Sequence, residues 1–443
     1  MKTPIADFLR AYSSEDRKRF HMPGHKGHGD AMRALDITEV DGADSLYSAD
    51  GIIKESERIA SEIFGAKSFY STEGSSLAIR AMLYLATLRF DKKSKKPTIL
   101  AGRNAHKVFI SAAAMLDFEV EWISGEGASY LSCPITSAEV ALALDSLDTL
   151  PVAVYLTSPD YLGNMLDISA IAEVCHERGV LLLVDNAHGS YLKFLKDSRH
   201  PIDLGADMCT DSAHKTLPAL TGSAYLHISR SLPDVYARCA KDALALFGST
   251  SPSYLILASL DELNATLAST FKDELSALIC KLDGLKGELL THGYTLAGDE
   301  PMKITISAKS YGYTGYELAA ELAGARIIPE FYDNDFLVLM PTPSNTDEEL
   351  SALSDALLAI PQRCEIKITA PALHTPERVC SIREAMLSPS EVVDLHLAVG
   401  RTLAVATVAC PPAVPIAVPG EIIDEDTVRV FEYYKTEKLT VIK

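Results

Sequence analysis

The stretch Ala206-Asp-Met-Cys-Thr-Asp-Ser-Ala-His-Lys215 decides how the rest of the chain is interpreted. It has the pattern of a short buried strand that runs into a polar turn ending at Lys215. A lysine at the end of a strand, flanked by Ser212 and His214, can lose its proton and add to a carbonyl group. A lone lysine is more often a solvated surface residue, so the interpretation depends on what else the chain places near it.

A carboxylate upstream gives Lys215 a chemical context. The run Val180-Leu-Leu-Leu-Val-Asp185 is apolar and ends in an acid, as expected of a second buried strand. An acid at one strand end and a lysine at a later one suit pyridoxal phosphate (PLP). The acid keeps the ring nitrogen protonated, and the lysine binds the cofactor aldehyde as an imine. The pair predicts a PLP site with Asp185 and Lys215 in these two roles.

Two strand-to-helix turns suit the same cofactor. A strand at 68–71 leads into Thr72-Glu-Gly-Ser-Ser76 and then a helix. Such a helix start presents free N–H groups to an anion, and Gly74 lets the backbone approach a phosphate closely. His106 follows a strand at 97–101, where it can cap the next helix, lie satisfied at the surface, or stack on the pyridine ring of PLP.

Short apolar runs alternate with amphipathic segments through the first half of the chain. Strands are predicted at 68–71, 97–101, 120–123, 152–156, 180–184, within 206–211 and at 223–228. Helices are predicted at 3–10 (with Thr3 as cap), 51–64, 77–89, 107–115, 137–147, 168–178 and 256–290. This alternation is typical of a parallel sheet covered on both faces, whose ligands bind at the C-terminal strand ends. Gly74, His106, Asp185 and Lys215 all fall at that edge.

The length of 443 residues predicts two or three domains or more. We expect an N-terminal wrapping segment (1–50), a large PLP-binding domain (51–290), a small β-α-β-α domain (291–365) and a C-terminal domain (366–443). The small domain has strands at 303–307 and 336–340 and helices at 315–322 and 346–358. The C-terminal domain has a strand at 404–409.

Charge and composition exclude several classes of protein. The net charge is −19, from 41 Lys and Arg against 60 Asp and Glu, which argues against nucleic acid or an anionic membrane as a partner. The chain has no run of transmembrane length, and its eight cysteines form no CxxC pair, as expected of a cytoplasmic protein. His21, His25 and His28 invite a metal site, but no cysteine or carboxylate with suitable spacing completes one. No metal is predicted.

The chain resembles the Orn/Lys/Arg decarboxylase family of fold-type-I PLP enzymes, in its short bacterial form. The motifs that carry the resemblance are His21-Met-Pro-Gly-His-Lys-Gly27, Gly51-Ile-Ile-Lys-Glu55, Gly74-Ser-Ser76, Arg103-Asn-Ala-His-Lys107, Asp185-Asn-Ala-His-Gly189, Ser212-Ala-His-Lys215, Ser249-Thr-Ser-Pro-Ser-Tyr254, Ser381-Ile-Arg-Glu-Ala385 and Val418-Pro-Gly-Glu421. Two stretches depart from the family pattern, Asp44-Ser-Leu-Tyr-Ser-Ala-Asp-Gly51 and Ala105, and these bear on the substrate.

The resemblance implies an aminotransferase-like α/β fold with a large seven-stranded, mostly parallel sheet and smaller α+β C-terminal domains. Lys215 would be the Schiff-base lysine, Asp185 the partner of the ring nitrogen, and His106 the stacking residue, with Ala187 beneath the ring. The implied cofactor-binding set is Gly74, Ser75, Ser76, His106, Asp185, Ala187, His188, Ser212, His214 and Lys215, with Thr250 or Ser251 reaching the phosphate of the neighbouring subunit. The expected assembly is therefore a homodimer with shared sites. Larger relatives carry an N-terminal wing domain used in building higher rings, whereas this sequence starts almost directly before His21, so a dimer or a dimer of dimers is expected.

The implied activity is decarboxylation of lysine, arginine or ornithine, which yields CO2 and an amine for polyamine biosynthesis. Two alternatives remain open: an aminotransferase or lyase on the same fold, and an inactive PLP-binding regulator. The ω-cation of the substrate needs an acidic partner. Glu421 is the leading candidate, although it can equally be a surface acid. Asp44 and Asp50 are the alternatives.

Overall fold

A seven-stranded sheet carries most of the residues singled out from the sequence. Its strand order is β1-β7-β6-β5-β4-β2-β3. The strands are β1 (Lys67–Ser71), β2 (Thr98–Gly102), β3 (Glu119–Ile123), β4 (Ala153–Thr157), β5 (Leu181–Asp185), β6 (Met208–Asp211) and β7 (Ala224–Ile228). Strand β7 runs antiparallel to β1 and β6, whereas β5 pairs with β6, and β2 with β3, in parallel. The predicted seven-stranded, mostly parallel sheet is confirmed.

The computed structural model describes residues 1–15, 17–88, 96–125, 127, 129–406 and 411–443. The chain packs as two units. One comprises Met1–Phe90, Val152–Val154 and Ile168–Ser276, and the other comprises Asp91–Pro151, Tyr155–Asp167 and Ala277–Lys443. The four domain boundaries expected from the sequence stay predictions.

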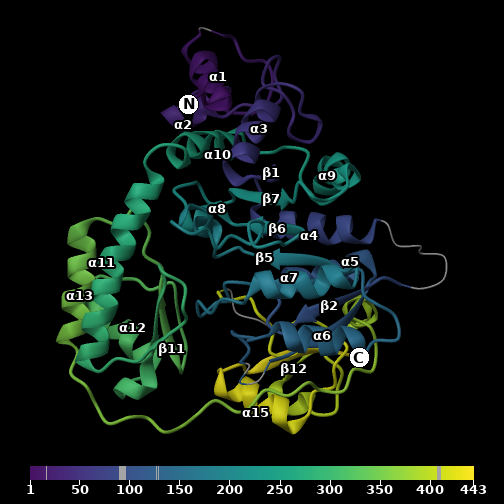
Figure 1. Cartoon of the computed structure of the whole chain (residues 1–443), viewed down its shortest axis with the longest axis vertical. Coiled ribbons are helices and arrows are strands. Elements are labelled where there is room, and N and C mark those ends of the chain that lie inside the picture. The colour runs from purple at the N-terminus through teal and green to yellow at the C-terminus, as the bar shows by residue number, and fades with distance from the viewer. Residues whose placement is uncertain (16, 89–95, 126, 128, 407–410) are drawn as a thin grey trace. The chain divides into compact units, whose positions relative to one another are not determined.

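The helices of the first unit pack on its strands and on one another. They are α1 (Pro4–Ser14), α2 (Ala31–Leu35), α3 (Ile52–Phe64), α4 (Gly74–Thr87), α7 (Ile168–Glu177), α8 (Ala213–Thr216), α9 (Asp234–Phe247) and α10 (Tyr254–Leu267). Helix α4 packs on β6, β7 and α9, while α1, α3 and α10 lie side by side (Figure 1). Buried aromatic rings, among them Phe64, Tyr70 and Tyr225, fill the space between α3 and the strands.

Helix α1 is capped by a residue far away in the sequence. Pro4 occupies its first turn as predicted, but the side chain of Thr3 makes no capping hydrogen bond. Instead the buried carboxylate of Asp261, on α10, accepts the N–H groups of Ile5 and Ala6 at 2.8 and 3.0 Å. The same carboxylate accepts the hydroxyl of Ser56, on α3, at 2.6 Å. The cap expected from Thr3 is therefore wrong, because a carboxylate from the packed neighbour takes its place.

The long helix predicted over 256–290 is two helices, α10 and α11 (Phe271–His292). Helix α10 ends where the N–H of Ala268 bonds back to the carbonyl of Asn264. The carbonyl of Thr270 then accepts the N–H groups of Asp273 and Glu274. Asp273 and Glu274 lie in the first turn of α11 and favour a helix start there, because their negative charges are attracted to the positive end of the helix dipole. The hydrophobic pattern continues from α10 into α11, so it gave no indication that one helix ends and another begins.

The second unit contains α5 (Lys107–Leu116), α6 (Ser137–Asp145), a four-stranded sheet and a two-stranded antiparallel sheet near the C-terminus. The sheet has the order β10-β11-β9-β8, built from β8 (Leu296–Ala297), β9 (Ile304–Ser307), β10 (Phe331–Tyr332) and β11 (Phe336–Leu339), with helices α12 (Gly315–Gly324) and α13 (Asp347–Ala359). The β-α-β-α order predicted for this region is confirmed, and the two-residue strands are additions. The C-terminal part consists of α14 (Ile382–Leu387), β12 (Ser390–Asp394), α15 (Glu425–Tyr433) and β13 (Lys438–Ile442).

The strand expected at 404–409 is not found where the structure describes it. Thr402 and Leu403 form isolated bridges, to Ile422 and Val441, and residues 404–406 belong to no strand. Positions 407–409 lie outside the described residues.

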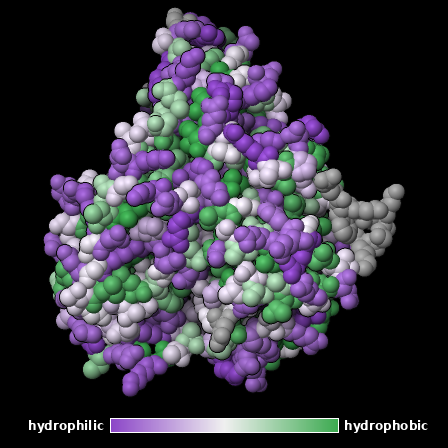
Figure 2. Space-filling model, viewed as in Figure 1, coloured by the Kyte–Doolittle hydropathy of each residue, from purple (hydrophilic) through white to green (hydrophobic). Residues whose placement is uncertain are grey.

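Among the described helices, none is both long and apolar enough to cross a membrane. Hydrophilic and hydrophobic residues are mixed over the face seen in Figure 2.

The cap on α1 yields a stability prediction. Asp261→Ala should lower the free energy of unfolding by about 2–4 kcal/mol, because two N–H groups and a hydroxyl lose a buried acceptor. Urea unfolding measures the change. The matched control is Glu262→Ala, which removes an exposed ion pair with Arg10 and should cost under about 0.5 kcal/mol. Equal costs for the two variants would contradict the buried cap.

Candidate active site

Lys215 lies in α8, a single helical turn directly after β6. Its Nζ is 3.0 Å from Nε2 of His188, a buried residue in the turn that follows β5. The backbone N–H of Lys215 bonds to the carbonyl of Ser212 at 3.1 Å, which fixes the turn. The lysine and the imidazole can therefore share a proton, which is what a lysine that must act as a neutral nucleophile requires.

Asp185 is the last residue of β5 and is 3% exposed. Its Oδ1 accepts the N–H of Ala187 at 3.1 Å, which shapes the turn leading to His188. Register in the parallel pair places Asp185 opposite Thr210 of β6. Two neighbouring strands of the sheet thus present an acid and a lysine from the turns at their C-terminal ends.

The start of α4 has the features of an anion site. Gly74, its first residue, has a φ of +70°, and a Cβ added there would meet nothing within 4 Å. No side chain caps this helix, so its first N–H groups have no side-chain acceptor. Ser212 donates its hydroxyl to that of Ser75 at 2.8 Å, and Ser76 follows in the same turn. A helix of this length with an open, uncapped start favours binding of a phosphate.

His214 lies beside the same turn. Its Nδ1 is 3.0 Å from the carbonyl of Ser223, and burial lowers the pKa of its imidazole. A neutral ring with Nδ1 protonated satisfies that carbonyl. The backbone of Gly222, one residue earlier, accepts the N–H of Gly74 at 2.8 Å. These contacts connect the turn that contains Lys215 to the start of α4.

Thr250 and Ser251 are exposed in the loop before α10. Ser249 donates its backbone N–H to Oε1 of Glu73 at 2.6 Å. The cap of α10 is Ser253, whose side chain accepts the N–H of Ile256. The hydroxyls of Thr250 and Ser251 are therefore not used for capping. Their predicted role at a neighbouring subunit's phosphate stays a prediction.

In the second unit, His106 is the N-cap of α5. Its Nδ1 accepts the N–H of Val108 at 3.2 Å, so a neutral ring carries its proton on Nε2. The sequence left capping and ring stacking as alternatives. The structure shows the capping, and stacking stays a prediction.

Glu421 is buried and bonded to Arg103. Its Oε2 lies 2.8 Å and its Oε1 3.1 Å from Nη2 of Arg103, and the backbone N–H of Val418 donates to Oε2 at 2.7 Å. Burial raises the pKa of Glu421, while Arg103 opposes that shift. The guanidinium also lies over the ring of Trp122, 5.2 Å from its centroid. The prediction that Glu421 binds the substrate stays open, but its carboxylate already has a cationic partner.

The other predicted acids lie in the first unit. Asp44 accepts backbone N–H groups from Ser45, Asp50, Gly51 and Ile53. These bonds outweigh its partial burial and lower the pKa of Asp44. Its carboxylate thus organises the loop before α3.

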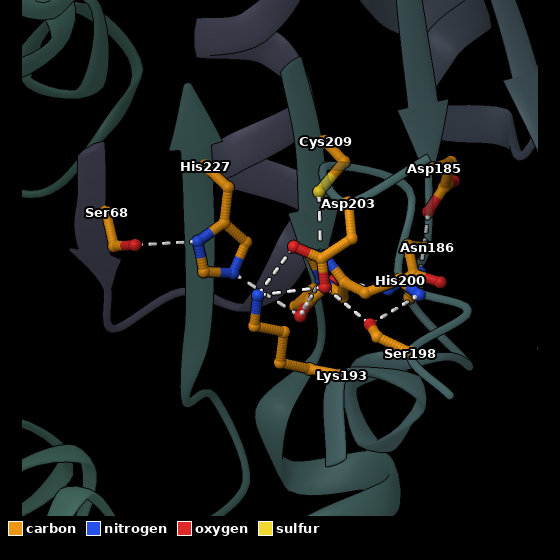
Figure 3. Close-up of polar contacts among 11 residues, drawn as sticks. Ser68, Asp185, Asn186, Lys193, Ser198, His200, Asp203, Cys209 and His227 are labelled. Carbon is orange, nitrogen blue, oxygen red and sulfur yellow. Dashed lines mark hydrogen bonds and ion pairs between the residues drawn. The ribbon is translucent and has the colours of Figure 1, made fainter. Parts of the chain in front are cut away.

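The sequence analysis missed a buried network around Asp211. Oδ2 of this carboxylate lies 3.1 Å from Nε2 of His200 and 3.3 Å from Nε2 of His227, and none of the three side chains is exposed to solvent. Nδ1 of His227, on β7, is 2.8 Å from the hydroxyl of Ser68 (Figure 3). Burial alone would raise the pKa of Asp211, but the two imidazoles, His200 first, hold it well below its usual range. A carboxylate ending one apolar strand and a histidine within another, His227, were the available signal.

The other oxygen of Asp211 reaches the turn after β5. Oδ1 accepts the side-chain N–H of Asn186 at 2.7 Å, and Asn186 directly follows Asp185. Cys209 lies nearby, with Sγ 3.9 Å from Nε2 of His200, and His200, Cys209 and Asp211 are close enough to share a metal ion. Burial raises the pKa of the Cys209 thiol well above its usual value, which disfavours the thiolate that a metal requires. We interpret the cluster as a hydrogen-bond network.

Comparison with known proteins identifies the family. The model of the major domain of Orn/Lys/Arg decarboxylases matches residues 3–282, and that of their C-terminal domain matches residues 371–440. The chain belongs to the Orn/Lys/Arg decarboxylase family. An arginine decarboxylase of Halalkalibacterium halodurans is 30% identical over 96% of this chain and 91% of its own length. An arginine decarboxylase of Bacillus subtilis is 29% identical over 96% and 92%.

Solved decarboxylase structures share the fold. The lysine decarboxylase of Francisella novicida superimposes with a TM-score of 0.81 at 18% identity, covering 100% of this chain and 81% of that one. The constitutive lysine decarboxylase of Escherichia coli gives 0.77 at 18% identity, covering 100% and 82%. The fold-type-I architecture expected from the sequence is confirmed.

This decarboxylase is a PLP enzyme, and its first unit fits the cofactor. The open space at Gly74 and the uncapped start of α4 suit the phosphate. The buried carboxylate of Asp185 suits a protonated ring nitrogen, and Lys215 supplies the amine for the aldehyde. The individual roles of these residues stay predictions.

The cofactor assignment yields a prediction for Lys215. Lys215→Ala should lose all turnover and the visible absorbance of lysine-bound PLP, because it removes the amine that we expect to hold the aldehyde. Asp185→Ala should keep part of its PLP but lose most of the rate. Absorption spectra and CO2 release measure both effects. Lys67→Ala, which removes a lysine paired with exposed Asp234, is the control and should behave as the unaltered enzyme. Lysine-bound cofactor in Lys215→Ala would refute the assignment.

Proposed function

We propose that this enzyme removes the α-carboxyl group of arginine, with lysine and ornithine as the alternatives to be tested. The observation that supports it most is the adjacency of Lys215 and His188, beside the buried acid that ends β5, in a chain of this family. Arginine is favoured because the relatives from H. halodurans and B. subtilis, aligned along nearly the whole chain, are named arginine decarboxylases.

Each residue has a distinct task in this proposal. Asp185 keeps a proton on the cofactor ring nitrogen, since a buried carboxylate strongly favours a cationic partner. When bound, PLP supplies the electron-withdrawing ring that accepts the charge left by the departing carboxylate. His188 takes a proton from the free Lys215 side chain and leaves its amine neutral, the form that binds the cofactor aldehyde. Gly74, Ser75, Ser76 and Ser212 bind the phosphate, and His214 supports that turn.

Decarboxylation ends with protonation at the substrate Cα. Lys215 and His106 are the proposed donors: Lys215 through the proton it shares with His188, and His106 through the Nε2 proton that its capping role retains. The α-carboxylate leaves as CO2, so no metal or oxidant enters the balance. The products are CO2 and the amine with one carbon fewer.

Parallel incubation of the purified enzyme and PLP with the three amino acids tests the substrate. We expect agmatine from arginine to dominate, because one methylene in an apolar pocket changes transition-state binding by only about 1–3 kcal/mol, whereas a guanidinium offers a different set of donors. Amine products and released CO2 are quantified together. Amino-group transfer without CO2, or no product from any of the three, would contradict the proposal.

The buried pair of Glu421 and Arg103 can be tested in the same assay. We expect Glu421→Gln to lower the free energy of unfolding by about 3–5 kcal/mol, because it leaves the guanidinium buried without its anion. A direct substrate contact would instead raise KM with stability unchanged. Urea unfolding and steady-state kinetics separate the two. Glu384→Gln, an exposed capping acid of α14, is the control.

We further propose a homodimer in which the loop carrying Thr250 and Ser251 completes the partner's phosphate site. Both side chains are exposed, and Ser253 already provides the local cap. Dilution to the monomer should therefore release PLP, and Thr250→Ala with Ser251→Ala should weaken PLP retention. Ser253→Ala should affect stability only. Sedimentation and cofactor fluorescence follow both, and a monomer that keeps PLP would refute the shared site.

A cytoplasmic location belongs to the same proposal. The seven cysteines within the described residues are all free thiols, as expected in a reducing compartment. Three of them, Cys133, Cys175 and Cys209, are buried.

A further inference from the structure

A tyrosine-lined pocket of about 280 Å3 lies within the second unit, among residues distant in the sequence. Its apolar floor includes Phe331, Val414 and Ile416. Its polar wall consists of four tyrosines and two acids, which we name the tyrosine–acid pocket: Tyr130, Tyr316, Glu330, Tyr332, Asp333 and Tyr434. No motif of the family resemblance falls among these six residues.

Asp333 gives this pocket a buried negative charge. It is 4% exposed, and its Oδ1 accepts the N–H groups of Asp335 and Phe336 at 2.7 and 2.8 Å. Its Oδ2 accepts the hydroxyl of Tyr130 at 3.2 Å. Among the described residues, no lysine, arginine or histidine forms an ion pair with Asp333. Asp335, only two residues away, is by contrast paired with Lys309 at 2.8 Å.

The tyrosines that line the pocket together with Asp333 have rings whose faces attract cations. The rings of Tyr130 and Tyr434 lie 4.4 Å apart between centroids, inclined by 57°. Those of Tyr316 and Tyr332 meet edge to face at 5.5 Å. One cation of the chain already contacts a tyrosine of the pocket, since Nζ of exposed Lys435 lies 3.7 Å from the Tyr316 ring centroid. Aromatic faces around an anion are the usual arrangement for binding organic cations.

We propose that the tyrosine–acid pocket binds the guanidinium or alkylammonium group of a small ligand, with Asp333 as its ionic partner. Glu330, held by the hydroxyl of Tyr161 at 2.9 Å, adds a second carboxylate at the exposed side. These two carboxylates repel an anionic ligand, and a neutral one would leave the buried charge of Asp333 uncompensated. The cation has two sources: the distal end of the amino-acid substrate, which rests on the proposed function, or a free amine such as the product.

Calorimetric titration of the holoenzyme with butylguanidine tests the site. This probe has the cationic group but no primary amine or carboxylate, so it does not react with the PLP aldehyde as a substrate would. Butylurea, its neutral isostere, is the matched control ligand. We expect the enzyme to bind butylguanidine and Asp333→Asn to bind it at least about tenfold more weakly, because a charge-assisted pair is lost.

Asp335→Asn is the matched control variant, because it removes a carboxylate two residues away that is paired with Lys309 and does not line the pocket. It should bind butylguanidine as the unaltered enzyme does. The proposal is overturned if the unaltered enzyme does not bind the probe at millimolar concentration, if butylurea binds equally well, or if Asp333→Asn and Asp335→Asn bind alike.

The pH dependence provides a second readout. Burial raises the pKa of Asp333 to about 6. The groups around it are Tyr130, Asp335, Tyr434 and the remaining acid and tyrosines of the pocket. Two lysines lie near them, Lys309 paired with Asp335 and exposed Lys435 over the Tyr316 ring, and neither forms an ion pair with Asp333 within the described residues. Binding requires the ionised carboxylate, so affinity should be full above pH 6 and fall by up to about tenfold per unit below it. Asp333→Asn should flatten this profile, and an unchanged profile would count against the site.

Kinetics distinguish the two sources. If the pocket takes the distal end of the substrate, Asp333→Asn raises KM, and butylguanidine competes with the amino acid. If it takes a free amine, KM is unchanged, and inhibition by butylguanidine is non-competitive and disappears in Asp333→Asn. Either result supports the cation site. An enzyme that decarboxylates none of the three amino acids would refute the proposed function while leaving the binding result intact.

Discussion

The buried carboxylate of Asp211 is the interaction on which the first unit's site depends. An ionised carboxylate without solvent is unfavourable by several kcal/mol, about 3–5, when its partners are removed. Here two imidazoles and the amide of Asn186 surround it. Asn186 follows Asp185 and Ser212 follows Asp211, so one anion fixes the turns after β5 and β6 together. The turns that carry Asp185 and Lys215, the residues proposed for the chemistry, are thus both tied to a third charge that has no proposed part in the reaction.

Local patterns were enough to predict the strands and the residues at their ends. Each strand is a short apolar run, and Asp185 and Lys215 stand at or just beyond such runs, so periodicity placed them without knowledge of the fold. The partners could not be predicted in the same way. Ser68 and His227 are 159 positions apart, and Asp261 caps a helix 256 positions earlier. Nothing in the local sequence of Thr3 shows that a distant carboxylate replaces its cap.

The acids illustrate a related limit. With 60 Asp and Glu in the chain, the sequence could rank candidates only by motif, and it favoured Glu421. The structure separates acids by what surrounds them: Glu421 faces a guanidinium, Asp44 a row of backbone N–H groups, and Asp333 a phenol and tyrosine rings. Whether a carboxylate has a cation beside it depends on tertiary packing, because the partner of Glu421 lies 318 positions away.

The cap on α1 also bears on how the chain acquires its structure during synthesis. Ile5 and Ala6 are synthesised well before Asp261, whose carboxylate accepts their N–H groups. At translation rates of about 5–20 residues per second, the N-terminal segment waits on the order of ten to fifty seconds for that partner. During this interval its apolar residues Ile5 and Leu9, buried in the finished protein, remain exposed. Helix α1 therefore acquires its cap only after residue 261 has been made, and until then its apolar face is available to chaperones.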